Sequence, residues 1–281
     1  FVAPYFFGKT TAELVLKDPS WLVEIGGRVW LRALGLFPDP HSFAFFLGLN
    51  FCFVFGAIFY QKEKARLLFL VSIILIFALF LTFSRGGYLG LSAAMAFFVV
   101  LAWSKMKESG RKFLISVLAL ILVVVIFWGG ATIFERFQSI FNFNEGSNLG
   151  RLQIWQDSFR VFRQYPLLGV GLGNYPAYFN FNGNYRSAIS SHNTYLDILA
   201  ETGFFGCAFW LLFFALVLRQ VFKKVKIKKE DGNLTFVYLG AGGSIIYFLV
   251  HSFFETAIFN PLILAWIATL SGFMFSQIKN D

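Results

Sequence analysis

Apolar runs close to the length of a membrane-spanning helix alternate with short polar turns along most of this chain. A helix needs about 17 to 25 largely apolar residues to cross a lipid bilayer, so the two shorter runs, which begin at Tyr88 and Phe113, cross it only if their ends extend. The pattern predicts an all-α, polytopic membrane bundle with about seven spans in this fragment. The predicted spans are Phe43–Tyr60, Leu67–Phe83, Tyr88–Trp103, Phe113–Trp128, Phe204–Val221, Thr235–Phe254 and Ala257–Phe275.

The basic residues between the apolar runs predict which side of the membrane each turn faces. They gather at 62–66, 105–112 and 219–229, which fall on one side when the spans are counted alternately. Cytoplasmic loops are enriched in Lys and Arg, so this side is predicted to be the cytoplasm. The N-terminal segment, the SRGG sequence, the long polar stretch before the fifth span and the turn at Glu255 then face outward.

The chain divides accordingly into four segments. We expect an extracytoplasmic segment at 1–42, spans one to four at 43–130, a large extracytoplasmic loop with amphipathic helices at 131–203, and spans five to seven at 204–281. The chain opens on FVAPYFFGK, which is similar to the tail of an earlier helix. We therefore expect a fragment of a longer membrane protein.

The composition agrees with lipid as the solvent of much of the surface. Of the 281 residues, 57% are hydrophobic and only 14% are charged, whereas soluble domains carry about 25% charged residues. The net charge of +9 does not indicate nucleic-acid binding, because the basic residues lie between apolar runs rather than on one face of a soluble domain. Cys52 and Cys207 both fall inside apolar runs, and the sequence has no spacing typical of a metal site.

The longest polar stretch, Gly150–Gly206, opens with the pattern of an amphipathic helix. Apolar side chains recur at helical spacing on one face, and Pro166 ends the pattern. A helix of this kind is expected to lie along the membrane surface. Its apolar face comprises Leu152, Trp155, Phe159 and Phe162, and its polar face comprises Gln153, Asp157, Arg160 and Gln164.

Two further patterns follow in the same stretch. The glycines of LLGVGLGN lack the strand and helix of a dinucleotide-binding fingerprint, so a flexible turn is a better interpretation than a phosphate-binding loop. In SSHNTYLDILAETG, Ser190 or Ser191 is suited to cap a helix that starts near Asn193. His192 then lies at the mouth of the helix that leads into the fifth span.

Three of these sequences together resemble the O-antigen ligase and polymerase family of bacterial membrane glycosyltransferases. They are SRGG at 84–87, GRLQIWQDSFRVFRQYPLLGVGLGNY at 150–175 and SHNTYLDILAETGFFG at 191–206. The segment RALGLFPDPHSFA at 32–44 is also similar, although His41 stands where the family usually has Asn. Their order, their placement at span ends and their shared side make the set more specific than any one sequence.

The resemblance implies a multi-pass enzyme of the bacterial cytoplasmic (inner) membrane whose active site lies on the extracytoplasmic face. Such enzymes move a polyprenyl-diphosphate-linked glycan to an acceptor hydroxyl during lipopolysaccharide or polysaccharide biosynthesis of the cell envelope. A ligase uses a lipid-linked core or a protein as acceptor, and a polymerase uses another lipid-linked glycan. The functional arginines of the family match Arg85 and Arg151, and its functional histidine matches His192.

These residue types suit that chemistry. An arginine stays charged and binds phosphate oxygens bidentately, so Arg85 and Arg151 can stabilise the departing diphosphate without a metal ion. The imidazole of His192 can remove the proton of the acceptor hydroxyl, and a single displacement would invert the anomeric centre. We therefore predict these three as catalytic residues, with no metal and no cofactor. Further substrate contacts are expected from Arg186, Asn193 and Glu255.

Each assignment has a structural alternative. Arg85 can reach lipid headgroups from the end of a span, Arg151 can anchor the amphipathic helix on anionic lipid, and His192 can be a capping or interfacial residue. For the whole protein, the alternatives are a solute transporter or permease and a non-catalytic partner of a glycan-assembly complex. A transporter should have ionisable or broken helices near mid-bilayer, whereas the predicted spans are almost free of charge at their centres.

Overall fold

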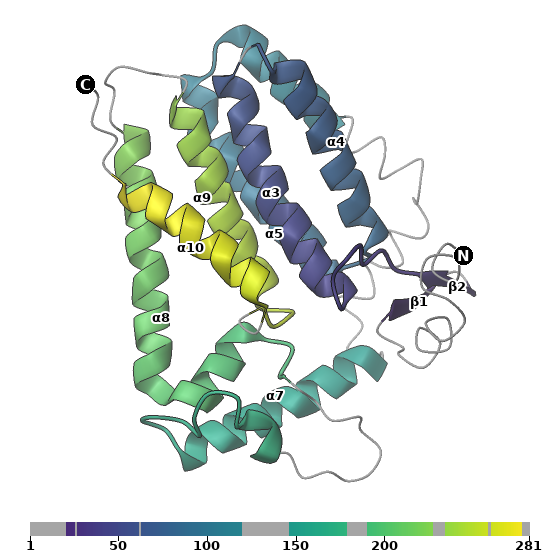
Figure 1. Cartoon of the computed structure of the whole chain (residues 1–281), viewed down its shortest axis with the longest axis vertical. Coiled ribbons are helices and arrows are strands. Elements are labelled where there is room, and N and C mark those ends of the chain that lie inside the picture. Colours follow the sequence, from purple (N-terminus) through teal and green to yellow (C-terminus); the bar gives the residue numbers. More distant parts are fainter. Residues whose placement is uncertain are drawn as a thin grey trace.

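The computed structural model describes residues 21–25, 27–61, 63–119, 146–178, 190–226, 234–257 and 260–276. Within these ranges the chain is helical apart from one short hairpin and the connecting turns, and the apolar helices form a bundle (Figure 1). The elements are β1 (Leu22–Ile25), β2 (Arg28–Leu31), α3 (Pro40–Tyr60), α4 (Ala65–Leu81), α5 (Arg85–Ala102), the 3₁₀ helix η2 (Trp103–Lys105), α7 (Gly146–Gln164), the 3₁₀ helix η3 (Tyr175–Tyr178), α8 (Thr194–Lys226), α9 (Leu234–His251) and α10 (Pro261–Phe275).

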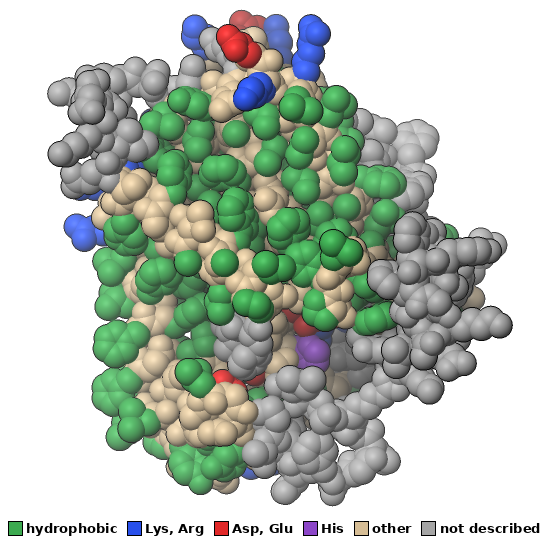
Figure 2. Space-filling model, in the orientation of Figure 1, with side chains coloured by type: hydrophobic (Ala, Val, Ile, Leu, Met, Phe, Trp, Pro, Cys, Tyr) green, Lys and Arg blue, Asp and Glu red, His purple; other side chains and the backbone are tan. Residues whose placement is uncertain are grey.

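Four of the described helices are long and apolar enough to cross a membrane, namely α3, α5 continued to Lys105, α8 and α9. Helices α4 and α10, with 17 and 15 residues, are apolar but shorter. All six overlap predicted spans, whereas much of the predicted span Phe113–Trp128 lies outside the described residues. Hydrophobic side chains cover most of the face in Figure 2, and several charged ones gather at its upper end. A multi-pass helical membrane protein is thus confirmed, and the count of seven spans stays a prediction.

Helices α3 and α9 form the centre of the bundle and pack through glycines. A Cβ on Gly240 would lie 2.8 Å from the carbonyl oxygen of Cys52, and a Cβ on Gly56 would collide with the carbonyl oxygen of Phe236. Small residues at such contacts let two helix backbones approach in a membrane, where lipid competes with side chains for apolar contact. In the most apolar window of α9, 78% of the residues are buried, compared with 17% in α8. Helix α9 is therefore the axis of the bundle, and α8 lies at its edge.

The same helices enclose one large aromatic residue toward the end of the bundle that faces α7. Tyr247 of α9 is fully buried and donates a hydrogen bond to the carbonyl oxygen of Ala44 in α3 at 2.7 Å. Gly48 of α3 lies against its ring, and a Cβ on Gly90 of α5 would lie 2.9 Å from its carbonyl oxygen. Tyr247 and the two glycines therefore fix α3, α5 and α9 relative to one another.

Helix α3 begins at Pro40 rather than at Phe43, the predicted start of the first span. The carboxylate of Asp39 accepts hydrogen bonds from the backbone N–H groups of His41 and Ser42, both at 2.8 Å. Proline suits the first helical position because it has no N–H to satisfy there. The cap holds His41 in the first turn of α3.

The N-terminal segment contains a hairpin that the all-α prediction did not include. Strands β1 and β2 pair antiparallel, with Leu22 opposite Leu31. After β2, the N–H of Ala33 donates to the carbonyl oxygen of Leu81 in α4 at 2.9 Å. This attachment places Arg32, which is buried, at the end of the bundle.

Helix α7 lies across the lower end of the bundle in Figure 1, and the chain returns from it into α8. The returning loop and α8 cross at two glycines in the left-handed region, Gly169 (φ 66°) and Gly203 (φ 67°). A Cβ on either would collide with the main chain of the other segment. The N–H of Gly171 also donates to the carbonyl oxygen of Glu201 at 2.8 Å. The sequence predicted a flexible turn here, but the turn is attached to α8 by main-chain hydrogen bonds and close backbone contact.

The helix predicted in the polar stretch is confirmed as α7, whereas its predicted place along the membrane surface stays a prediction. Trp155 is partly covered by the protein, whereas Leu152 and Phe159 are 36% and 41% exposed. The covered face includes two polar residues, Arg151 and Ser158, which have hydrogen-bond partners inside the protein. A hydrophobic pattern does not register polar residues that are buried with partners.

Candidate active site

Glu255 lies in the turn between α9 and α10 and is 4% exposed. Its N–H donates to the carbonyl oxygen of His251 at 3.2 Å, and its own carbonyl oxygen accepts from Oγ1 of Thr194 at 2.9 Å. Its backbone is therefore held by α9 on one side and by the start of α8 on the other. This attachment gives the carboxylate a fixed place at the end of the bundle.

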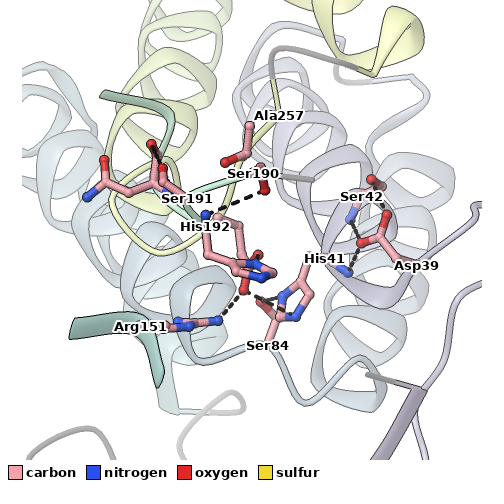
Figure 3. Close-up of polar contacts among 12 residues, drawn as sticks. Asp39, His41, Ser42, Ser84, Arg151, Ser190, Ser191, His192 and Ala257 are labelled. Atoms are coloured by element: carbon pink, nitrogen blue, oxygen red, sulfur yellow. Dashed lines mark hydrogen bonds and ion pairs between the residues drawn. The ribbon is translucent and has the colours of Figure 1, made fainter. Parts of the chain in front are cut away.

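Three side chains from distant parts of the chain contact this carboxylate. Nη2 of Arg151 contacts Oε1, and Nε2 of His41 lies 3.2 Å from the same oxygen. Nδ1 of His192 lies 2.9 Å from Oε2. Figure 3 shows His41, Arg151 and His192 converging on one place from three different segments. We call these four residues the carboxylate cluster.

The charges of the carboxylate cluster influence one another. Burial alone would raise the pKa of the Glu255 carboxyl, but its interactions with the nearby His41, Arg151 and His192 side chains hold that pKa well below its usual range. In return, the negative charge of Glu255 outweighs burial and raises the pKa of His192. An ionised carboxylate only accepts hydrogen bonds, so Nδ1 of His192 is the donor. In the neutral ring, Nε2 of His192 then keeps its lone pair.

The loop that carries His192 is held in a conformation rare for its residue type. His192 has a φ of 52°, in the left-handed region that non-glycine residues seldom occupy. The N–H of the preceding Ser191 donates to Oδ1 of Asp197 at 2.7 Å, and its carbonyl oxygen accepts from Nε1 of Trp155 at 3.1 Å. The second oxygen of Asp197 accepts a hydrogen bond from Thr256, the neighbour of Glu255. Asp197 thus joins the His192 loop to the Glu255 turn.

Asn193 caps α8, which corrects the prediction that Ser190 or Ser191 would be the cap. Its Oδ1 accepts from the N–H groups of Tyr195 at 3.0 Å and Leu196 at 3.2 Å. Asn193 is buried, and this use of its oxygen leaves the amide N–H₂ as the group with which it could contact a substrate.

The SRGG sequence brings the start of α5 against the carboxylate cluster. Oγ of Ser84 accepts the N–H of Gly87 at 3.2 Å and lies 3.4 Å from Nδ1 of His41 and 3.2 Å from Nε2 of His251. A Cβ on Gly86 would lie 2.7 Å from the ring of His251, so this glycine permits the contact. Arg85, the first residue of α5, is partly buried and directly follows Ser84.

The structure brings together three of the six predicted site residues, Arg151, His192 and Glu255. Arg85 and Asn193 are the chain neighbours of Ser84 and His192, and Arg186 lies outside the described residues. Among the described residues, no three His, Cys, Asp or Glu side chains are grouped so that they could hold a metal ion.

His41 and Arg32 were not among the predicted site residues. Nη1 of Arg32 lies 3.2 Å from Nε2 of His41, and Nε of Arg32 donates to the carbonyl oxygen of Thr82 at 2.7 Å. The one signal for these residues was their place in RALGLFPDPHSFA, just before a predicted span. The position of Arg32 depends on the hairpin, which the pattern did not predict.

The fold and the site together define a multi-pass helical membrane protein that gathers arginine and histidine side chains around one buried carboxylate. The chain belongs to the O-antigen ligase family, because the sequence model of that family, described as O-antigen ligase, matches residues 70–211. The matched part includes Arg85, Arg151 and His192, whereas Glu255 lies after it.

Two curated proteins are similar to this chain over most of its length. The teichuronic acid biosynthesis protein TuaE of Bacillus subtilis (strain 168) is 25% identical over 248 residues, which cover 83% of this chain and 49% of the relative. The exopolysaccharide production protein ExoQ of Rhizobium meliloti (strain 1021) is 24% identical over 256 residues, which cover 81% of this chain and 54% of the relative. The chain spans about half the length of these curated relatives.

Proposed function

We propose that this chain carries the catalytic centre of a membrane glycosyltransferase of the O-antigen ligase or polymerase type. It would move a glycan from a polyprenyl diphosphate to an acceptor hydroxyl at the extracytoplasmic face of the bacterial cytoplasmic membrane. Family membership supports the reaction class, as do two relatives named for the production of polysaccharides. The observation that carries the proposal is the contact of Glu255 with both Arg151 and His192, because it unites a phosphate-binding group with a proton acceptor.

His192 is proposed as the general base. Glu255 orients the ring through Nδ1, so the lone pair of Nε2 is available to accept the proton of the acceptor hydroxyl. The carboxylate also stabilises the imidazolium that forms, as its effect on the pKa of His192 indicates. The side chain of His192 is 44% exposed, so an acceptor can approach it and the proton can later pass to water.

Arg151 and Arg85 are proposed to bind the donor diphosphate. As the acceptor oxygen bonds to the anomeric carbon, the bond from that carbon to the diphosphate breaks and the diphosphate leaves with the electron pair. Guanidinium groups stabilise this growing charge through bidentate contacts with phosphate oxygens. Attack opposite the departing group inverts the anomeric configuration. Arg186 and the amide of Asn193 are proposed as further substrate contacts.

The test is glycan transfer in membranes that contain the full-length protein with His192→Ala or Arg151→Ala. We expect each change to lower the transfer rate by about 10²–10⁴-fold at an unchanged protein level, which covers the usual contributions of a positioned base and of a charge-stabilising donor. Arg160→Ala is the matched control, because this arginine lies on the same helix but is 68% exposed and pairs with Asp157. Its rate should stay within about twofold of the wild type, as for most surface changes.

Unchanged transfer by the His192 variant would show that His192 is not the base. It would favour the alternatives of a solute transporter or a non-catalytic partner of a glycan-assembly complex. Equal losses for Arg151→Ala and Arg160→Ala would instead assign both arginines to attachment of α7 to the membrane.

A further inference from the structure

The two oxygens of Glu255 are held differently. Oε2 is within hydrogen-bond distance of His192, and Oε1 is shared by Arg151 and His41. If the proposed function is correct, on which this inference rests, Arg151 must also serve the donor. A diphosphate carries more negative charge than one carboxylate, so it competes with Glu255 for the guanidinium. When Arg151 turns toward the donor, His41 is the other contact of Oε1 in the described part of the chain.

Nε2 of His41 can form either of two hydrogen bonds, one with Arg32 and one with Glu255. Its Nε2 lies 3.2 Å from Nη1 of Arg32, which can only donate, and 3.2 Å from Oε1 of Glu255, which can only accept when ionised. One nitrogen cannot satisfy both at once. With a lone pair on Nε2, His41 accepts from Arg32; with a proton there, it donates to Glu255.

Ser84 allows both states of the ring. Its hydroxyl lies 3.4 Å from Nδ1 of His41, and a hydroxyl can donate to that nitrogen or accept from it. The side chain of His41 is 20% exposed, so a proton can be exchanged with water. Arg32 is held by its own hydrogen bond to Thr82 and does not need to move.

We propose that His41 is a positioning residue that keeps Glu255 directed at His192 while Arg151 is engaged with the donor diphosphate. In the resting site, Arg151 holds Oε1 and His41 accepts from Arg32. In the donor complex, Nε2 of His41 donates to Oε1 in place of Arg151. The base therefore stays oriented at the stage of the reaction in which it is used.

The experiment compares His41→Leu with His41→Gln in membranes with saturating donor and acceptor. Leucine removes both hydrogen bonds, whereas the glutamine amide has an N–H₂ for Glu255 and an oxygen for Arg32. We expect kcat to fall about tenfold in His41→Leu and to stay within about threefold of the wild type in His41→Gln, because a hydrogen bond to a charged group is lost in the first and kept in the second.

A double-mutant cycle with Glu255→Gln separates positioning from a general effect on folding. Once the negative charge is gone, His41→Leu should cost less than about twofold, since the charge-assisted hydrogen bond that it removes no longer exists. An equal tenfold cost in both backgrounds, or no loss in His41→Leu, would overturn the proposal. If His41→Leu does not reach the membrane in normal amount, His41→Ala takes its place in the same cycle with the same expectations.

The two proposals fail in different ways. Wild-type rates for His192→Ala and Arg151→Ala would overturn the proposed function, and the role of His41 with it. Suppose that those two variants lose most of their rate, while His41→Leu either keeps the wild-type kcat or loses the same factor with and without Glu255→Gln. That result would overturn the positioning role alone.

Discussion

Helices α3 and α9 differ in character between their middle and the end that faces α7. In the middle, glycines without side chains let the two backbones approach closely, as at Gly56 and Gly240. At that end they present polar side chains, His41 from α3 and His251 from α9, and Glu255 follows in the next turn. Close packing fixes the two helices relative to each other. It therefore also fixes where the side chains at their ends lie.

The donors gathered at this end explain why a buried charge is tolerated there. A carboxylate as enclosed as Glu255 is costly unless several donors surround it. Arg151 and His192 come from segments outside the α3–α9 pair. The packed helices therefore fix the position of the Glu255 carboxylate, and the polar stretch contributes two of the side chains that bind it. A change in the middle should therefore affect the whole fold, whereas a change at the end should affect the reaction first.

The largest effect is expected from filling the packed middle with Gly240→Leu. A Cβ there already lies 2.8 Å from a carbonyl oxygen of α3, so the helices must separate. Overpacking costs about 1–3 kcal/mol or more, and we expect little folded protein by fluorescence-detected size exclusion in detergent. Gly243→Ala is the control, because a Cβ at Gly243 has its nearest neighbour at 3.6 Å. Normal yields for Gly240→Leu would show that the close α3–α9 contact is not required.

The second effect concerns the end of the bundle that faces α7 and is measured with Glu255→Gln. We expect kcat to fall about 10- to 100-fold, because the base loses an oriented, charge-assisted partner. His192 acts as a base only when deprotonated, so the rate rises as pH rises through its pKa. Glu255 raises that pKa, and its loss should move the rise in rate to lower pH while lowering the plateau.

The partly exposed carboxylate of Asp157 provides the control for this pH profile, since Asp157→Asn removes the same charge from a position outside the carboxylate cluster. It should leave the profile where it is in the wild type. A lower plateau for Glu255→Gln without a shift of the profile would mean that the carboxylate does not act through His192.

The span pattern could be predicted from the sequence because each span depends on local composition. The arginines and the histidine could be found because they lie in short, recognisable sequences. The contacts between them could not, since Glu255 meets His192 and Arg151 across 63 and 104 residues of chain. Those contacts depend on where the α9–α10 turn falls, which is set by packing. The hairpin was missed because each strand has only four residues.

A smaller effect is expected on the pH dependence of stability. The pKa of Glu255 is lower in the folded protein than in the unfolded chain, so its ionisation stabilises the fold above about pH 4.3. This stabilisation is lost as pH falls through the lower, folded pKa. Wild-type protein in detergent should therefore have a higher Tm than Glu255→Gln at pH 7, and the difference should close in acid. A difference that does not change between pH 7 and pH 3 would contradict an ionised Glu255.

The smallest effect is expected from Trp155→Phe, which tests how firmly the polar stretch is fixed to the site. The change keeps the aromatic ring but removes the hydrogen bond from Nε1 to the carbonyl oxygen of Ser191, the residue before His192. One such bond contributes about 0.5–1.5 kcal/mol, so we expect a two- to tenfold loss of kcat with little change in Tm. The loss should be confined to kcat, because the loop would be less well oriented rather than absent.

Trp103→Phe is the matched control, since Trp103 is 41% exposed at the opposite end of α5 from Arg85. A loss of rate in both variants would indicate a general sensitivity to tryptophan replacement. A loss in Trp155→Phe alone would show that the orientation of His192 depends on α7. The packed helices would then position the carboxylate, and α7 would position the base.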